Sequence, residues 1–190
     1  MASWLESHSP RLFDELAMNE TIRTNLRKVS LQANPPHLIL AGPPGVGKTA
    51  SWRLIARQIL GPSWRSTTHV LQARDLARSA GAMKTFEDFL RPGGSSSKDT
   101  LAGRSSLDSF DSNITNAVEG DTPPAGIENH ESNNQPSSKV SRLIIIEDAD
   151  HLGPTRQPYL RRMMESTSST SRFIFTARSP SRLIDALRSR

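Results

Sequence analysis

The sequence contains no cysteine, and this absence excludes several kinds of chemistry. A chain without thiols cannot form a disulfide framework, bind zinc through cysteine or use a thiol nucleophile. The chain also has no apolar run near the ~20 residues that a membrane-spanning helix needs. Its first residues, MASWLESHSP, lack the basic and then apolar layout of a signal peptide. We therefore expect an intracellular protein with no membrane partner.

Acidic residues are scarce outside one segment. The 190 residues include 24 Lys and Arg against 19 Asp and Glu, a net charge of +5. Residues 92–138 hold two basic and seven acidic residues, so the remainder holds 24 − 2 = 22 basic and 19 − 7 = 12 acidic residues, a net of +10. A folded part this basic indicates a polyanionic partner, nucleic acid first, or merely a solvated surface. Charge alone leaves both interpretations open.

Residues 92–138 are also poor in hydrophobic side chains. Ser, Gly, Pro and Asn supply 10, 5, 4 and 5 of these 47 residues. Such a segment buries too little apolar surface to offset the entropy lost on ordering. We predict a disordered acidic insertion at 92–138 between two parts of one domain, 1–91 and 139–190.

Outside the insertion, short apolar runs alternate with amphipathic stretches. The predicted strands are HLILA (37–41), HVLQARD (69–75), SRLIIIEDAD (141–150) and SRFIFTARS (171–179). The predicted helices cover about 20–32, the stretch between the glycine loop and Gly61, 81–91, 155–166 and part of 181–190. This alternation predicts an α/β domain with a mainly parallel sheet.

The phosphate loop, GPPGVGKT at residues 42–49, satisfies the pattern G-x-x-x-x-G-K-[ST] in full. Its glycines let successive backbone N–H groups point inward, and the helix that follows directs its positive end to the same point. A triphosphate suits this geometry, with Lys48 at the β and γ phosphates and the Thr49 hydroxyl helping to hold Mg²⁺. The alternative is an unrelated glycine turn, which a flanking strand and helix disfavour.

The acidic segment, EDAD at residues 147–150, ends a run of three isoleucines. Carboxylates this close together need a cation, a proton or a substrate to offset their repulsion. In phosphate-loop proteins a second strand ends with acidic residues at the magnesium ion and the attacking water. We therefore predict that Glu147 and Asp148 face a metal and a phosphate; the alternative is an acidic strand cap.

Five stretches fit one known pattern: SWLESHSPRLFDEL near the start, GPPGVGKT, EDAD, LRRMMES and the terminal SRFIFTARSPSRLIDALRSR. Together they resemble the small subunits of replication factor C, the sliding-clamp loaders of the AAA+ class. The likeness covers about residues 4–89 and 140–190. It implies a three-layer P-loop NTPase domain, interrupted by the insertion, with the lid and collar domains of the family missing.

The resemblance implies specific roles for the nucleotide site. ATP would contact the phosphate loop and the next residue, Mg²⁺ would lie at Thr49 and Glu147, and Asp148 would activate the attacking water. Lys48 would be catalytic as well as phosphate-binding. The nucleotide-binding residues would be Gly42, Pro43, Pro44, Gly45, Val46, Gly47, Lys48, Thr49 and Ala50.

Three arginines are assigned to interfaces by the same resemblance. Arg190 falls where the family has an arginine that reaches the ATP site of a neighbouring subunit and acts there in trans on the transition state. Arg161 and Arg162 match paired arginines near subunit contacts and DNA. The alternatives are a free terminal side chain for Arg190 and solvated helix charges for Arg161 and Arg162.

Three features depart from the family pattern. The family has Asp and then Glu where this chain has Glu147 and then Asp148, which lengthens the metal ligand and shortens the base. An alternative register puts Asp148 at the metal and Ala149 at the base position; the ungapped distance to LRRMMES favours the first register. Arg178 stands where the family has a polar Asn, and HSP at residues 8–10 replaces Tyr-Arg-Pro.

The resemblance implies an ATP-binding clamp-loader subunit with weak or conditional ATP hydrolysis in DNA replication or repair. Its expected partners are other clamp-loader subunits, a sliding clamp and primer-template DNA, and its expected location is the nucleus. Two alternatives remain open: a non-hydrolysing structural subunit that supplies Arg190 to a neighbour, and an AAA+ ATPase of another branch. Whether the chain is an enzyme stays undecided at this stage.

Overall fold

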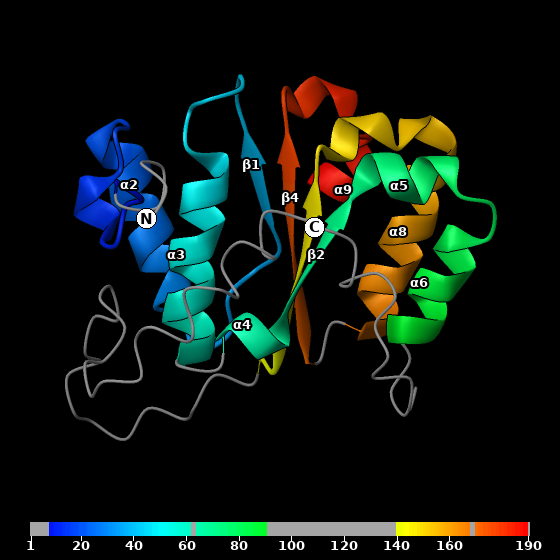
Figure 1. The fold of residues 1–190 in the computed structure, drawn as a ribbon, viewed down its shortest axis with the longest axis horizontal. Coiled ribbons are helices and arrows are strands. Elements are labelled where there is room, and N and C mark those ends of the chain that lie inside the picture. The colour runs from blue at the N-terminus through cyan, green and yellow to red at the C-terminus, as the bar shows by residue number, and fades with distance from the viewer. Residues whose placement is uncertain (1–7, 62–63, 91–139, 168–169, 190) are drawn as a thin grey trace, which may run out of the picture.

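The fold is built around a sheet of four parallel strands with the order β1-β4-β3-β2. The computed structural model describes residues 8–61, 64–90, 140–167 and 170–189. The strands are β1 (Leu38–Ala41), β2 (Thr68–Gln72), β3 (Arg142–Glu147) and β4 (Ser171–Ala177). Because all of them run in the same direction, their carboxyl ends meet at one edge, at the top of Figure 1.

Helices cover both faces of the sheet, so the domain has three layers (Figure 1). One face carries α2 (Glu20–Ser30) and α3 (Lys48–Leu60); the other carries α5 (Ala73–Arg78), α6 (Ala82–Leu90), α8 (Gly153–Thr167) and α9 (Asp185–Arg188). The short element η1 (Phe13–Glu15) precedes α2, and α4 (Trp64–Thr67), η4 (Ala149–His151) and η5 (Pro180–Arg182) lie between the longer elements in the chain. The predicted α/β fold with a parallel sheet is confirmed.

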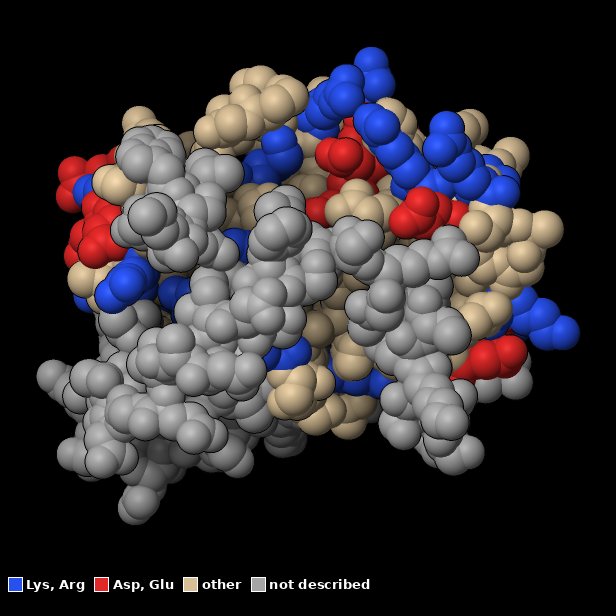
Figure 2. All heavy atoms as spheres, in the orientation of Figure 1, with Lys and Arg blue, Asp and Glu red and all other residues tan. Residues whose placement is uncertain are grey.

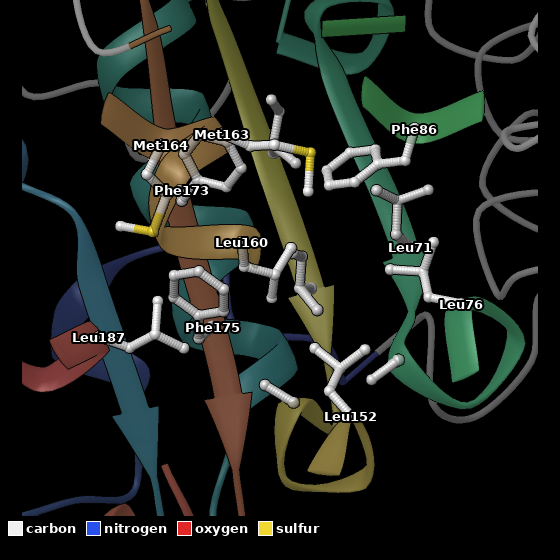
Figure 3. Close-up of a cluster of buried hydrophobic side chains, with 14 of the residues drawn as sticks. Leu71, Leu76, Phe86, Leu152, Leu160, Met163, Met164, Phe173, Phe175 and Leu187 are labelled. Atoms are coloured by element: carbon white, nitrogen blue, oxygen red, sulfur yellow. The ribbon is translucent and has the colours of Figure 1, made fainter. Parts of the chain in front are cut away.

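Each face of the sheet has its own hydrophobic core. On the α3 side, Trp52 and Ile55 pack with Leu143 and Ile145 of β3. On the other side, shown in Figure 3, α8 contributes Leu160, Met163 and Met164, which pack with Phe173 and Phe175 of β4. Since both faces are covered, the central strands are buried almost throughout, as the run LIII in β3 predicts.

The buried side chain of Gln157 joins α8 to the segment that precedes α9. Its Nε2 donates to the carbonyl oxygen of Arg182 at 3.1 Å, and its Oε1 accepts from the backbone N–H of Ile184 at 2.7 Å. Only 1% of Gln157 is exposed, so its amide makes these bonds away from solvent. The beginning of α9 is therefore fastened to α8.

The opposite, amino-terminal edge of the sheet is tied together by Arg172 and His37. Arg172 donates to the carbonyl oxygen of Pro35 at 2.7 Å and to the side-chain oxygen of Asn34. The backbone N–H of Phe173 donates to His37 Nδ1 at 3.0 Å. Burial lowers the pKa of His37 to about 4, and the neighbouring charge of Arg172 acts in the same direction. The imidazole is therefore neutral at neutral pH.

Two predicted strands end three residues earlier in the structure than the sequence suggests, at Gln72 and at Glu147. HVLQARD forms a strand only as far as Gln72, because Gln72 pairs in register with Glu147, the last residue of β3. The chain then enters α5 at Ala73. SRLIIIEDAD stops at Glu147 because Asp148 adopts a left-handed backbone, with φ 52° and ψ 44°, and turns the chain into η4.

Two further predictions concern the insertion and membrane-spanning helices. The insertion predicted at 92–138 lies outside the described residues. Over the parts of the chain that are described, no helix combines the length and the apolar character needed to cross a bilayer.

Candidate nucleotide-binding site

The phosphate loop connects β1 to α3 at the carboxyl edge of the sheet. The backbone N–H of Gly42 donates to the carbonyl oxygen of Ala177 at 3.1 Å, so the loop begins beside β4. Gly45 and Gly47 have φ values of 84° and 90°, which glycine adopts without the strain that a Cβ would cause. Gly47 is also the N-cap of α3, whose positive end therefore faces the loop. The local geometry is that of an anion site.

Lys48 folds back over the start of the phosphate loop. Its Nζ donates to the carbonyl oxygens of Gly42 and Pro43, at 2.7 Å and 3.0 Å. The ammonium is thus held among the backbone groups of the loop, within reach of an anion that binds there. Pro43, Pro44 and Gly45 are exposed, so the loop is open to ligands from solvent.

The carboxylate of Glu147 accepts hydrogen bonds from side chains of two other elements. Thr49 Oγ1 donates to Oε1 at 3.4 Å and Trp52 Nε1 donates to the same oxygen at 3.2 Å, both from α3. Gln72 Nε2, at the end of β2, donates to Oε2 at 2.6 Å. The structure therefore brings Thr49 and Glu147 together, as the sequence predicts, and adds Trp52 and Gln72.

The side chains around Thr49 suit a magnesium ion that arrives with a triphosphate. Magnesium prefers oxygen ligands and is usually bound by one or two carboxylates together with substrate phosphates. Glu147 supplies a carboxylate and Thr49 a hydroxyl, 3.4 Å apart and beside the phosphate loop. Within the described ranges, no group of three or more His, Cys, Asp or Glu side chains is placed to hold a metal. The donor set fits a shared protein and phosphate site rather than a protein cage.

Asp148 follows Glu147 with an unusual backbone. It is the one non-glycine residue with positive φ among those that the structure describes. Its backbone N–H donates to Thr176 Oγ1 on β4 at 3.0 Å, which fixes the turn. A left-handed conformation costs a non-glycine residue roughly 1–2 kcal/mol, although Asp tolerates it better than most.

Asp150, the last residue of the acidic segment, is engaged elsewhere. Its side chain is 0% exposed, and Arg182 Nη1 of η5 lies 3.6 Å from Oδ2. The arginine therefore offsets the charge of this carboxylate. Only part of the acidic segment is thus available to a metal or a phosphate.

The other predicted residues have different surroundings. Arg178 is exposed and directly follows Ala177, the residue that accepts the hydrogen bond from the phosphate loop. Arg161 pairs with Glu165 one helical turn away at 3.2 Å, and Arg162 is exposed on the same helix. Arg190 lies outside the described residues.

Trp52 and Gln72 are site residues that the sequence prediction missed. Trp52 lies three residues after Thr49, and positions i and i+3 share one face of a helix. This spacing could have indicated that the indole points toward the same strand end as Thr49. Gln72 ends a strand whose pairing register with β3 is not visible from a local pattern.

Positive side chains gather near the carboxyl edge of the sheet. Figure 2 shows Lys and Arg over the upper right of the molecule, where Figure 1 draws α5 and the chain near α9. These elements contribute Arg74 and Arg78 from α5, Arg182 from η5 and Arg188 from α9. Asp and Glu interrupt the positive area. On the face that Figure 2 shows, part of the positive charge thus lies near the carboxyl ends of the strands, where the phosphate loop also begins.

Comparisons with known proteins agree with this geometry. The family model of the ATPase family associated with various cellular activities (AAA) matches residues 38–190. Replication factor C small subunit 1 of Pyrobaculum islandicum is 29% identical over 187 residues, which are 98% of this chain and 44% of the relative. The replication factor C small subunit of Thermofilum pendens is 30% identical over 98% of this chain and 45% of its own length. The chain thus spans less than half the length of these relatives.

Solved structures show the same fold at lower sequence identity. Thermotoga maritima RuvB, a Holliday junction branch migration motor, superposes with a TM-score of 0.57 and 17% identity, covering 96% of this chain and 46% of that one. A point mutant of the same protein gives a TM-score of 0.59 at 16% identity, over 97% of this chain and 47% of that one. Similarity at this level concerns the fold alone.

Proposed function

The chain belongs to the ATPase family associated with various cellular activities, and on that premise we propose that it binds ATP with Mg²⁺ as a subunit of a sliding-clamp loader. The observation that carries the proposal is the contact of Thr49 Oγ1 with Glu147 Oε1, 3.4 Å apart although 98 residues separate them in the chain. The similarity to replication factor C small subunits supports the clamp-loader part of the proposal.

We assign the nucleotide to the phosphate loop and to Ala50. The backbone of the loop and Lys48 hold the phosphates, and Thr49 and Glu147 hold Mg²⁺, which neutralises charge on the phosphates. Asp148 positions and activates the attacking water. Its side chain is one methylene shorter than the family's Glu, so the water is held less well and hydrolysis is slow or depends on partners.

The proposed assembly is a hetero-oligomer of clamp-loader subunits that acts with a sliding clamp on primer-template DNA, in replication or repair. Arg190 reaches the ATP site of a neighbour, and Arg161 and Arg162 contact DNA or a neighbouring subunit. The positive area in Figure 2 supports a polyanionic partner. The protein works where chromosomal DNA is copied, which is the nucleus in a cell that has one.

A second candidate is a subunit that binds ATP, does not hydrolyse it, and supplies Arg190 to its neighbour. The order of Glu147 and Asp148 and the left-handed backbone of Asp148 favour it. The two candidates share nucleotide binding and differ only in turnover. Single-turnover hydrolysis in the assembled complex separates them, because only the first candidate predicts it.

Calorimetry with ATP, in the presence and absence of Mg²⁺, tests nucleotide binding. We expect Mg²⁺-dependent binding that Lys48→Ala abolishes, because this substitution removes the charge placed at the loop. Lys28→Ala, which removes an exposed lysine from α2, is the matched control and should bind ATP as the unchanged chain does. A folded, unchanged chain that binds no ATP would refute the proposed function.

A further inference from the structure

Glu147 accepts a hydrogen bond from Trp52 that the phosphate-loop pattern does not predict. Its Oε1 accepts from the Trp52 indole at 3.2 Å and lies 3.4 Å from Thr49 Oγ1, so the indole and the hydroxyl converge on one oxygen atom. The phosphate-loop pattern ends at Thr49 and specifies nothing for position 52. The indole contact is therefore a feature of this chain that its motif does not explain.

The position of Trp52 is fixed by the core. The side chain is 2% exposed and packs among the residues between α3 and the sheet, including Ile55 and Leu143. Its Nε1 is a donor only, so it can neither bind a metal nor compete with Glu147 for one. A rigid ring with a single donor can orient a carboxylate without occupying the metal site.

The hydrogen bond between Trp52 and Glu147 depends on the length of the glutamate side chain. An aspartate at position 147 would withdraw the carboxylate by up to about 1.5 Å, the length of one C–C bond. The indole of Trp52, fixed by its packing, could not follow that movement. The hydrogen bond from Trp52 therefore requires a side chain as long as glutamate at position 147. It occurs in a chain in which the order of the two acidic residues at 147 and 148 is exchanged.

From this geometry we infer that Trp52 is a positioning residue for the magnesium site: its indole N–H holds Oε1 of Glu147 beside Thr49 Oγ1. The inference rests on the proposed binding of ATP with Mg²⁺. It assigns Trp52 a role beyond filling the core, and it explains how a glutamate can occupy the metal position in this chain. Glutamate has one more rotatable bond than the family's aspartate. Without the indole N–H its carboxylate is less restrained, so it loses more rotamers when a metal binds.

Trp52→Phe tests the inference, because it removes the N–H and keeps an aromatic ring in the core. The measurement is a Mg²⁺ titration of the full chain at a fixed concentration of a non-hydrolysable ATP analogue, with calorimetry as the readout. Loss of a residue that orients a metal ligand typically weakens metal affinity by 10–100-fold, so we expect the Mg²⁺ midpoint to rise by about tenfold. Affinity for the analogue without Mg²⁺ should stay unchanged.

Trp64→Phe is the matched control. Trp64 is 6% exposed and belongs to the same core, but its ring faces the cations of Arg57 and Arg65. This variant should lose a comparable amount of packing while the Mg²⁺ midpoint stays where it is. Equal shifts in both tryptophan variants would mean that loosened packing is responsible, and the inference would be overturned.

Glu147→Asp gives a second test that leaves the core intact. The shorter side chain no longer reaches the indole N–H of Trp52, so the Mg²⁺ midpoint should rise. Adding Trp52→Phe to this variant should produce no further rise. Independent, multiplying effects of the two substitutions would overturn the inference. If Trp52→Phe proves too unstable to compare with the control, Glu147→Asp alone decides, and a Mg²⁺ midpoint that does not rise in this variant would overturn the inference. If the unchanged chain binds no ATP, the proposed function fails; if it binds and the midpoints do not move, only the role of Trp52 fails.

Discussion

The phosphate loop and the acidic segment meet at the carboxyl edge of the sheet, and they differ in how they follow the pattern of nucleotide-binding proteins. The loop has every required residue, the glycine conformations and the lysine contacts of an anion site. The acidic segment has the right composition in an altered order, with Asp148 in a left-handed turn and Asp150 paired to Arg182. In the proposed function, ATP binding depends on the loop, which follows the pattern, and ATP hydrolysis depends on the acidic segment, which departs from it. Substitutions in the two regions can therefore test binding and hydrolysis separately.

The largest expected effect comes from Asp148→Asn, which keeps a residue that tolerates the left-handed turn and removes the proposed base. General-base catalysis typically contributes about 10²–10⁴-fold, so hydrolysis in the assembled complex should fall by that order. ATP affinity should change by less than about twofold, since the loop is untouched. Single-turnover hydrolysis and calorimetry on the same preparation measure both quantities.

Asp148→Glu is the opposite change at the same position. The added methylene gives the proposed base the length of the family's glutamate, and a correction of about 1 Å in the position of a catalytic group can restore up to about 10² in rate. Hydrolysis that stays the same in both variants would show that Asp148 is not the base, and would favour the non-hydrolysing subunit.

A smaller effect is expected from Thr176→Val, which removes the acceptor of the Asp148 backbone N–H. Thr176 is 3% exposed, and leaving a partly buried N–H without its partner should lower the free energy of unfolding by about 1–2 kcal/mol. Hydrolysis should fall while ATP affinity remains, because the substitution loosens the acidic segment and not the loop. Denaturant unfolding and the two nucleotide assays check this.

Thr68→Val is the control for that substitution. The Thr68 hydroxyl is buried and makes no hydrogen bond within the described structure, so its removal should be neutral or slightly stabilising. Equal destabilisation by the two Thr→Val changes would show that the contact between Asp148 and Thr176 contributes nothing measurable.

The smallest effect on nucleotide binding and hydrolysis is expected at the amino-terminal edge, far from both regions. Because the pKa of His37 is lowered to about 4 from an ordinary 6.5, the unfolded chain binds a proton that the folded chain does not. Stability should therefore fall as the pH decreases from about 6.5 to about 4, and it should level off below that. Unfolding by denaturant across this range measures the slope.

His37→Asn should flatten that slope, since Asn Oδ1 can still accept from the Phe173 N–H but does not titrate in this range. ATP affinity at neutral pH should be the same as in the unchanged chain. A steep slope that persists in the variant would show that His37 is not the cause of the pH dependence.

The phosphate loop and the strands were predictable because their signals are local. Eight consecutive residues define the loop, and the run LIII marks a strand buried on both faces. The end of β2 was predicted wrongly because it depends on where β3 stops, 75 residues away, and not on the composition of HVLQARD.

The surroundings of Glu147 were predictable only in part. The pairing with Thr49 follows from the motif, whereas the indole of Trp52 and the amide of Gln72 reach Glu147 from positions 95 and 75 residues away. Such contacts depend on register and on side-chain length, which a single sequence does not display. The ion pair of Asp150 with Arg182 was missed for the same reason.

The amide of Gln157 has a mechanical consequence. By bonding Arg182 and Ile184 at once, it connects α8 directly to the segment that leads into α9. A displacement of α8, the helix that carries Arg161 and Arg162, should therefore also displace α9. A Gln157→Leu change would uncouple α8 from α9 while leaving both helices formed.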